Sequence, residues 1–287
     1  MADLELGISV ADARRLQQLE TVTTLDVEAI TAFLDDADIA ALVPAHVTAS
    51  HLYFGSEFCE HLFPEPTALE RAIAVAAQLG LTLVLATPVA NDRLVARILG
   101  AAGQLPEDAE ILVNDWGVAG ALRSAQPHRR LVAGRQLAKM IKDPRLPSPE
   151  WMKPYPSGYD GAGYRAILEA LRIGRIELDV PPFATSGTFA VDGIGVSVWA
   201  PFAYVAKGRI CKIGSLQRER EDKFSPGGAC HRECLAVVEA GAEPSVTGIV
   251  SYARGNTIYY RHDATMGQAL CAALAQGLVS RLVLSGV

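Results

Sequence analysis

The sequence has no apolar run long enough to span a membrane as a helix, and no apolar segment near its N-terminus resembles a secretion signal. It also has no excess of positive charge. Its 26 Lys and Arg residues stand against 32 Asp and Glu residues, which gives a net charge of −6. We therefore predict a soluble, cytoplasmic protein with no membrane span and no nucleic-acid partner.

Two common hydrolase motifs are missing. The chain contains no Gly-x-Ser-x-Gly elbow, and its six histidines form no His-Glu-x-x-His zinc motif. Internal repeats and low-complexity tracts are absent as well. The sequence therefore gives little support to a serine hydrolase or a zinc peptidase of these kinds.

Cysteine is scarce, and the odd number of five argues against a framework of disulfide bonds. In a cytoplasmic protein, clustered cysteines more often bind metal. Cys211, Cys230 and Cys234 lie within 24 residues of one another, in a polar segment unlike the apolar runs that hold buried thiols. Cys230 and Cys234 can place two thiolates on one side of a tight turn, and Gly227 and Gly228 just before them let the backbone come close.

Three thiolates are one short of an all-cysteine zinc or iron–sulfur site, and Cys59 is a candidate for the fourth. Zinc and iron–sulfur clusters use the same ligands, so the residues alone leave both open. The wide gap between Cys59 and Cys211 disfavours a local zinc ribbon, and a third interpretation is that the thiols are unrelated. Cys271 falls in an apolar helical pattern and is predicted to lie in the core. Arg209, Lys212 and Arg232 are placed to favour thiolates.

Strands and helices alternate along the chain. With 287 residues, half of them hydrophobic, the chain can bury a large core. The pattern predicts strands at 51–54, 81–86, 110–113, 130–133, 175–180, 196–205 and 281–284. It predicts helices at 25–34, 67–79, 91–102, after 117, at 164–173 and at 266–279. This rhythm is typical of βαβ units and a parallel sheet.

Three stretches depart from the rhythm. Residues 5–24 show no clear pattern, and residues 143–162 predict a long loop that serves as a linker or a lid. Residues 247–252 and 256–260 flank Arg254-Gly255 and predict a hairpin.

Polar residues follow several predicted strands, among them Glu57, the pair Asn114-Asp115, and Arg135. In (β/α) barrels the carboxyl ends of the strands carry the active site, so the recurrence favours a site there. Taken singly, each Asn or Asp could instead cap the helix that follows it.

Glu177 and Asp179 lie two residues apart on an apolar strand, so both side chains point to the same face. Charged residues on a buried face need a partner or a chemical role. The two carboxylates are candidates for acid–base groups or for ion pairs with arginine, and no residue is assigned as catalytic.

Several local patterns follow one another along most of the chain. They are Tyr53 to Cys59, Val113 to Gly117, Gly134-Arg135 with Lys139-Met140 and Asp143-Pro144-Arg145, Glu177-Leu178-Asp179, and Cys211 with Cys230 and Cys234. Their shared order resembles the collagenase-like peptidase U-32 family. The resemblance is nearest to the subgroup that acts in oxygen-independent hydroxylation of ubiquinone precursors, although the segment before His51 is longer here.

The resemblance implies a barrel-like α/β fold related to the TIM barrel. We expect one domain over residues 1–287 with a cluster-binding segment at 205–240. The resemblance also implies a 4Fe-4S cluster, and the matching ligand positions are Cys59, Cys211, Cys230 and Cys234. A UbiU-like member of the same family is the implied partner in a hetero-oligomer.

The implied substrates are small molecules, with prephenate as an oxygen donor. A dicarboxylate of this kind needs a guanidinium fork, for which Arg135 and Arg145 are the candidates. The further substrate-binding candidates are Asn114, Asp115, Glu177 and Asp179. The alternative functions are a U-32-type peptidase, a hydroxylase subunit for RNA modification, and a structural zinc protein.

Overall fold

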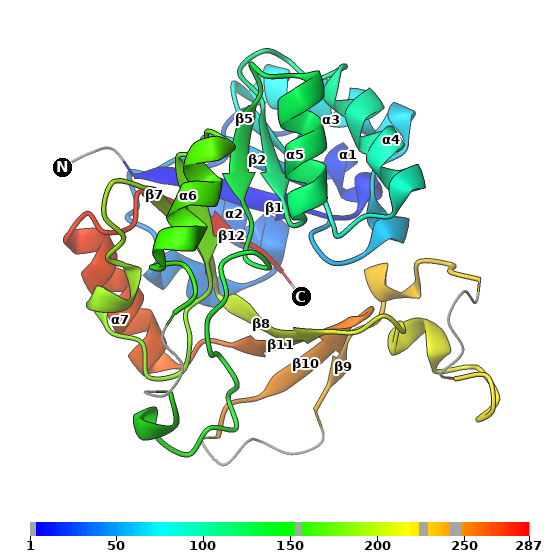
Figure 1. Ribbon diagram of the computed structural model, residues 1–287. Helices are drawn as coiled ribbons and strands as arrows, with labels where there is room; N and C mark the ends of the chain where they lie inside the picture. The colour runs from blue at the N-terminus through cyan, green and yellow to red at the C-terminus, as the bar shows by residue number, and fades with distance from the viewer. Residues whose placement is uncertain (1–3, 153–156, 224–228, 242–247, 287) are drawn as a thin grey trace.

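The computed structural model describes residues 4–152, 157–223, 229–241 and 248–286 (Figure 1). Its centre is a closed barrel of eight parallel strands with helices between them, which confirms the predicted α/β barrel. Gly227, Gly228 and the expected start of the hairpin at Thr247 lie outside the described residues. None of the described helices has the length and hydropathy needed to cross a membrane.

The barrel closes by pairing the first strand with the last. Its order is β1 (Glu5–Val10), β12 (Arg281–Leu284), β7 (Gly195–Ala200), β6 (Arg175–Leu178), β5 (Arg130–Ala133), β4 (Glu110–Val113), β3 (Thr82–Ala86) and β2 (His51–Gly55). The sequence did not predict β1, because Gly7 and Ser9 interrupt its apolar residues. Gly7 is needed there, since a Cβ at this position would lie 2.6 Å from the Tyr53 ring.

Helices cover the outside of the barrel. They are α1 (Leu16–Leu19), α2 (Val27–Leu34), α3 (Pro66–Leu79), α4 (Asp92–Ala102), α5 (Trp116–Ala125), α6 (Ala162–Ala170) and α7 (Ala264–Ala275). Short 3-10 helices lie at η1 (Ala13–Arg15), η2 (Ala37–Ala41), η3 (Glu60–Leu62), η4 (Pro149–Trp151), η5 (Ser186–Phe189), η6 (Ile213–Ser215) and η7 (Glu233–Leu235). The predicted helix ends follow local chemistry: the Asn91 side chain caps α4, and Gly80 ends α3 in the left-handed conformation.

A second sheet of four antiparallel strands lies beside the barrel (Figure 1). Its order is β8 (Phe202–Lys207), β11 (Thr257–Arg261), β10 (Ser251–Arg254) and β9 (Glu239–Ala240). It contacts the carboxyl ends of the barrel strands, because Tyr204 donates to the carbonyl of Arg135 (3.1 Å) and Tyr260 to that of Val180 (2.6 Å).

The hairpin of β10 and β11 confirms one prediction, and β7 and β8 correct another. The expected single strand over 196–205 is wrong. Pro201 separates β7 from β8, and proline lacks the N–H that a continuous ladder needs. As a result β7 stays in the barrel, and β8 carries the chain into the second sheet and on toward Cys211.

The barrel interior is only partly apolar. Its apolar residues form a cluster separate from the large core between strands and helices: Tyr53, Val84, Ala86, Leu112, Val132, Trp199 and Val283. Glu177 lies among them, fully buried. At the amino ends of the strands, Arg281 forms a two-point ion pair with Glu110 (2.6 and 3.1 Å). Charged groups therefore lie at both ends of the barrel and in its middle.

Candidate functional site

The polar residues predicted at the strand ends meet at the carboxyl mouth of the barrel. The Arg135 guanidinium donates to both Glu57 oxygens and, at 2.8 Å, to Asp179 Oδ1. Lys142 pairs with the other Asp179 oxygen. All four side chains are buried, and their two positive and two negative charges cancel.

Each charge at the mouth is held by its neighbours. Burial alone would lower the pKa of Arg135, but the carboxylates of Glu57 and Asp179 raise it overall. Burial would raise the pKa of Asp179, and the charges of Lys142 and Arg135 outweigh this effect and lower it. Burial lowers the pKa of Lys142 to about 8, against the opposing attraction of Asp179.

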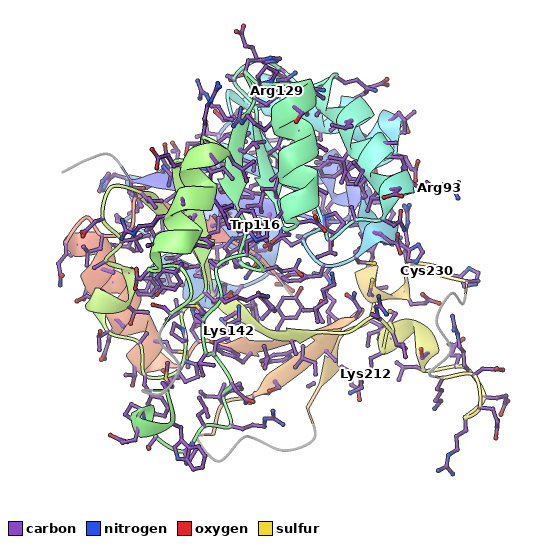
Figure 2. The ribbon with its side chains drawn as sticks, viewed as in Figure 1. Arg93, Trp116, Arg129, Lys142, Lys212 and Cys230 are labelled. Atoms are coloured by element: carbon purple, nitrogen blue, oxygen red, sulfur yellow. The ribbon has the colours of Figure 1, made fainter. Side chains whose placement is uncertain are left out.

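Aromatic rings complete the mouth. The Arg135 guanidinium lies 4.0 Å from the centre of the Trp199 ring, and the Lys142 ammonium lies 3.3 Å from that of Tyr204. Phe58 packs on Tyr204 with ring centres 4.7 Å apart. Lys142, which sequence reasoning missed, follows β5 and reaches the second sheet (Figure 2).

Glu177 lies deeper, inside the barrel. Tyr53 donates its hydroxyl proton to one carboxyl oxygen at 2.7 Å, and the Trp199 indole N–H donates to the other at 2.5 Å. Burial raises the pKa of Glu177 to about 7, the nearby Glu57 charge adds to this, and the two hydrogen bonds oppose it. Glu177 therefore titrates near neutral pH beneath the arginine of the mouth.

Asn114 and Asp115 make different contacts. Asn114 is buried, donates to the carbonyl of Thr87 (3.1 Å) and accepts from the Gln136 N–H (3.2 Å). Asp115 accepts from the first N–H groups of α5, so the capping interpretation describes its contacts. Gly134 fits against Asn114 because a Cβ there would lie 2.3 Å from Asn114 Oδ1.

Arg145 stands apart from these residues. Its side chain is 78% exposed and pairs with Asp143 two residues away. The structure therefore brings together five of the six substrate-binding candidates, with Asp115 at the edge, and leaves Arg145 outside. The Arg135 guanidinium is already engaged by Glu57 and Asp179 through Nε and both terminal nitrogens, and by the Trp199 ring.

The four predicted ligand cysteines come from three segments that meet at one end of the second sheet. Cys59 follows β2, Cys211 precedes η6, and Cys234 lies in η7. Figure 2 shows Cys230 and Lys212 on this side of the molecule. Cys59, Cys211 and Cys230 all lie near enough to Cys234 for their charges to act on it.

The thiols influence one another through charge. Burial, together with the charges of Cys59 and Cys211, raises the pKa of Cys234 to about 11. Burial likewise raises the pKa of Cys59, with Cys230 and Cys211 adding to the effect. Without metal these raised pKa values keep Cys59 and Cys234 protonated at neutral pH, and a metal ion that binds a thiol displaces its proton.

Thiolates are ligands that zinc and iron–sulfur clusters use, and glycine leaves room beside two of the sulfurs. A Cβ on Gly214 would lie 3.3 Å from Cys211 Sγ, and one on Gly255 would lie 3.5 Å from Cys234 Sγ. Within the residues that the structure describes, however, no three His, Cys, Asp or Glu side chains form a group ready to hold a metal ion. The four-cysteine ligand set stays a prediction.

The positive charges near the thiols are partly unexpected. The charge of Arg254 opposes the rise in the pKa of Cys234, and Lys207 lies close enough to Cys59 for their charges to interact. Neither residue was among the predicted cations. Lys212 is instead paired with Glu239 at 3.0 Å. Arg209 is exposed. Lys207 and Arg254 belong to β8 and β10, so only the pairing of the second sheet brings them to the cysteines.

Cys271 corrects a prediction. It is exposed, not buried in the core. The buried side of α7 consists of Met266, Ala269, Leu270 and Ala273, and residue 271 falls one step past this stripe. Cys271 does lie apart from Cys230, since α7 and Cys230 stand on opposite sides of the molecule (Figures 1 and 2).

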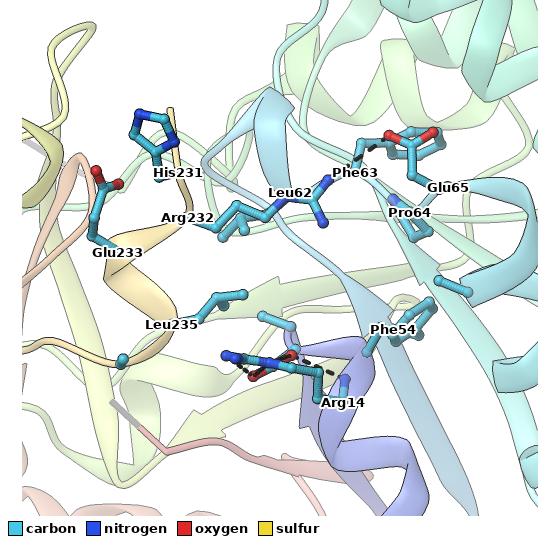
Figure 3. A pocket seen from close by; sticks show the side chains of 15 residues that line it. Arg14, Phe54, Leu62, Phe63, Pro64, Glu65, His231, Arg232, Glu233 and Leu235 are labelled. Atoms are coloured by element: carbon cyan, nitrogen blue, oxygen red, sulfur yellow. Dashed lines mark hydrogen bonds and ion pairs between the residues drawn. The ribbon is translucent and has the colours of Figure 1, made fainter. Parts of the chain in front are cut away.

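A cleft of about 400 Å³ lies between the cysteine segment and the ends of β1 and β2 (Figure 3). Apolar side chains form part of its wall, including Phe54, Phe63 and Leu235. Arg232 extends into it, with one long contact of 3.8 Å to Glu65, and its backbone adopts the left-handed conformation (φ 61°). Among the described residues, this is the contact found for the Arg232 guanidinium, so it can offer N–H donors to a ligand.

No protein-family model and no curated protein matches the chain. Solved structures resemble it distantly. A phosphodiesterase from Oleispira antarctica is 16% identical with a TM-score of 0.30, over 45% of this chain and 47% of that one. The chain thus spans about half of that enzyme.

Two longer matches cover nearly the whole chain. The C-terminal domain of a putative chitinase from Desulfitobacterium hafniense is 8% identical with a TM-score of 0.40, over 99% of this chain and 93% of that one. The spore cortex-lytic enzyme SleL of Bacillus cereus is 9% identical with a TM-score of 0.41, over 99% and 71%. Likeness at this level carries no argument about function.

Proposed function

We propose that the protein is an iron–sulfur protein of the U-32 type that acts, like UbiV, in oxygen-independent hydroxylation of a ubiquinone precursor. The observation that carries the proposal is that Cys59, Cys211 and Cys230, from separate segments, lie near enough to Cys234 to act on it through charge, beside a buried polar barrel mouth. The resemblance of the local sequence patterns supports the choice of reaction.

In this proposal the four thiolates hold a 4Fe-4S cluster, which when bound supplies one-electron redox chemistry. Four cysteine ligands leave no iron position open to a substrate. This favours electron transfer or a reaction shared with a second protein over independent catalysis, and a UbiU-like family member is the proposed partner. Arg254 and Lys207 offset part of the thiolate charge.

The cleft is the proposed place of the small-molecule substrate. Prephenate, as an oxygen donor, would offer carboxylates to Arg232 and its ring to the apolar wall. Arg135 is less suited than the sequence suggested, because Glu57 and Asp179 already take up its donors. Its role here is to hold the loop that carries Cys59, two residues beyond Glu57.

Anaerobic purification tests the cluster. We expect a broad visible absorbance and about four iron and four sulfide per chain. Cys230→Ser should lose most of the iron and the visible band, and Cys271→Ser, the matched control, should keep both. Bound zinc without a visible band would instead support the structural zinc alternative. Iron retained in Cys230→Ser would show that Cys230 is not a ligand.

Growth of a deletion strain without oxygen tests the pathway. Loss of ubiquinone with accumulation of an under-hydroxylated precursor is the expected result. Normal quinone with a change in RNA modification would move the protein to the RNA alternative. Peptide cleavage that survives loss of the cysteines would revive the peptidase alternative.

A further inference from the structure

The turn between β10 and β11 contains no cysteine, yet it contacts all three segments that carry the predicted ligands. The turn consists of Arg254, Gly255 and Asn256. It lies about twenty residues beyond Cys234 and nearly two hundred beyond Cys59. Each of its residues makes a different contact.

Asn256 joins the Cys59 and Cys211 segments. Its amide nitrogen has two protons, and it donates to the carbonyl of Phe58 (2.9 Å) and to that of Gly208 (3.0 Å). Phe58 directly precedes Cys59, and Gly208 lies three residues before Cys211. The Thr257 hydroxyl donates to the Asn256 amide oxygen at 3.1 Å, which fixes the direction of the amide.

The backbone of the turn adds to this link. The Asn256 carbonyl accepts from the Gly208 N–H at 2.7 Å, and the Gly255 carbonyl accepts from the Ile213 N–H at 3.3 Å. The segment around Cys211 is therefore tied to the turn on both sides of the cysteine.

Gly255 and Arg254 hold the third segment. Arg254 donates to the carbonyl of Cys234 at 3.0 Å. Gly255 has a φ of +61°, and a Cβ there would lie 3.3 Å from Cys234 Cβ and 3.5 Å from its sulfur. The position therefore suits glycine through both its conformation and its closeness to the thiol.

We propose that the Arg254-Gly255-Asn256 turn positions the cysteine site, with Asn256 holding the Cys59 and Cys211 segments at the spacing that lets their thiols share one metal centre. This inference rests on the proposed four-cysteine site. Residues that orient metal ligands from outside commonly change metal affinity by about 10- to 100-fold when replaced.

Asn256→Asp is the sharpest test. The new side chain has nearly the same shape and still accepts from Thr257, but at neutral pH it cannot donate to the carbonyls of Phe58 and Gly208. The matched control is Ile258→Ala, because this neighbour in β11 is 41% exposed. The probe is Co²⁺ added without oxygen, whose thiolate charge-transfer bands grow with the number of bound sulfurs.

Wild type and Ile258→Ala should give the band intensity of four thiolates. Asn256→Asp should bind Co²⁺ about 10- to 100-fold more weakly or with fewer thiolates, while its urea unfolding midpoint without metal confirms a folded chain. Equal affinity and band intensity in Asn256→Asp and wild type would overturn the inference. If Asn256→Asp does not fold, Asn256→Ala takes its place.

A second measurement separates this inference from the proposed function. A short bis-maleimide should join Cys59 to Cys211 in the metal-free wild type, and mass spectrometry of the peptides detects the link. If wild type binds neither iron nor cobalt, the proposed function fails. The part of the inference that assigns Asn256 to the spacing of the Cys59 and Cys211 segments still stands if the cross-link is lost in Asn256→Asp, and it falls if the yields are equal.

Discussion

Arg135 balances the charge of the barrel mouth. Its guanidinium forms ion pairs with both Glu57 and Asp179 and lies over the ring of Trp199. The sequence identified Arg135 as a polar residue after a strand but could not show that its partners are protein carboxylates. Those partners follow β2 and β6, and only the closed barrel brings them together.

Replacing Arg135 with alanine should be strongly destabilising. The change leaves Glu57 and Asp179 buried with Lys142 as their remaining cation, and loss of one partner of a buried pair costs about 3–5 kcal/mol. Urea unfolding followed by circular dichroism measures the loss. The control is Arg145→Ala, whose exposed pair with Asp143 should change the free energy of unfolding by less than about 1 kcal/mol. Similar effects of the two changes would contradict this account.

Glu177 should make stability depend on pH. Its pKa is raised to about 7 in the folded state, from 4.5 for an exposed glutamate. Between these pH values the folded state holds a proton that the unfolded state has released, so the free energy of unfolding falls as pH rises. The stabilisation from protonated Glu177 is therefore fully present below pH 4.5 and is lost as the pH rises to about 7.

The Glu177→Gln variant should remove this contribution. Burial lowers the pKa of His51 to about 4 and that of His262 to about 3. Below pH 6.5 these two groups make the free energy of unfolding rise with pH, which opposes the effect of Glu177. The measurement is therefore the difference between wild type and Glu177→Gln in urea unfolding at several pH values from 4.5 to 8. A difference that does not change with pH would show that Glu177 titrates normally.

The elements were predicted well where one pattern dominated. Strands β2 to β5 have apolar runs bounded by Gly, Asn or Asp, and the observed bounds agree closely with the predicted ones. The strand β1 was not predicted because Gly7 and Ser9, which are not apolar, interrupt its apolar residues. The break at Pro201 was not predicted, because period-two alternation continues through both β7 and β8 although they belong to different sheets.

The cysteine site could be predicted only in part. The sequence pointed to the thiols through their spacing and family resemblance. It gave no signal for Asn256, Arg254 or Lys207, because these residues reach the site through the pairing of the second sheet. Tyr53 and Trp199 were hidden in the same way, since each looks like an ordinary apolar strand residue until Glu177 is placed between them.

The orientation of α7 predicts the order in which the thiols react. In metal-free protein at pH 8, Cys271 should react first with iodoacetamide because it is exposed. Cys234 should react last, because it is buried and its pKa is about 11. Timed alkylation followed by peptide mass spectrometry gives the order. Cys271→Ser should remove the fastest phase, and rapid labelling of Cys234 would contradict the structure.

The whole molecule should unfold as one unit. Tyr204 and Tyr260 tie the second sheet to the barrel, and β12 closes the barrel between β1 and β7. Leu282→Ala, at a fully buried position of β12, should lower the free energy of unfolding by about 2–5 kcal/mol. Tryptophan fluorescence and circular dichroism should report the same single transition.

The control is Val89→Ala, at a position that is 45% exposed and should have little effect. Two separate transitions in Leu282→Ala would mean that the second sheet folds independently. That result would replace the predicted single domain by two.

The pairing of β1 with β12 has a consequence for synthesis of the protein on the ribosome. The first strand emerges early but cannot gain its second neighbour until the last strand has been translated. Cys59 likewise waits for the β10–β11 turn, which is made nearly two hundred residues later. A metal bound at the proposed cysteine site would therefore meet a chain that has been translated at least as far as Asn256.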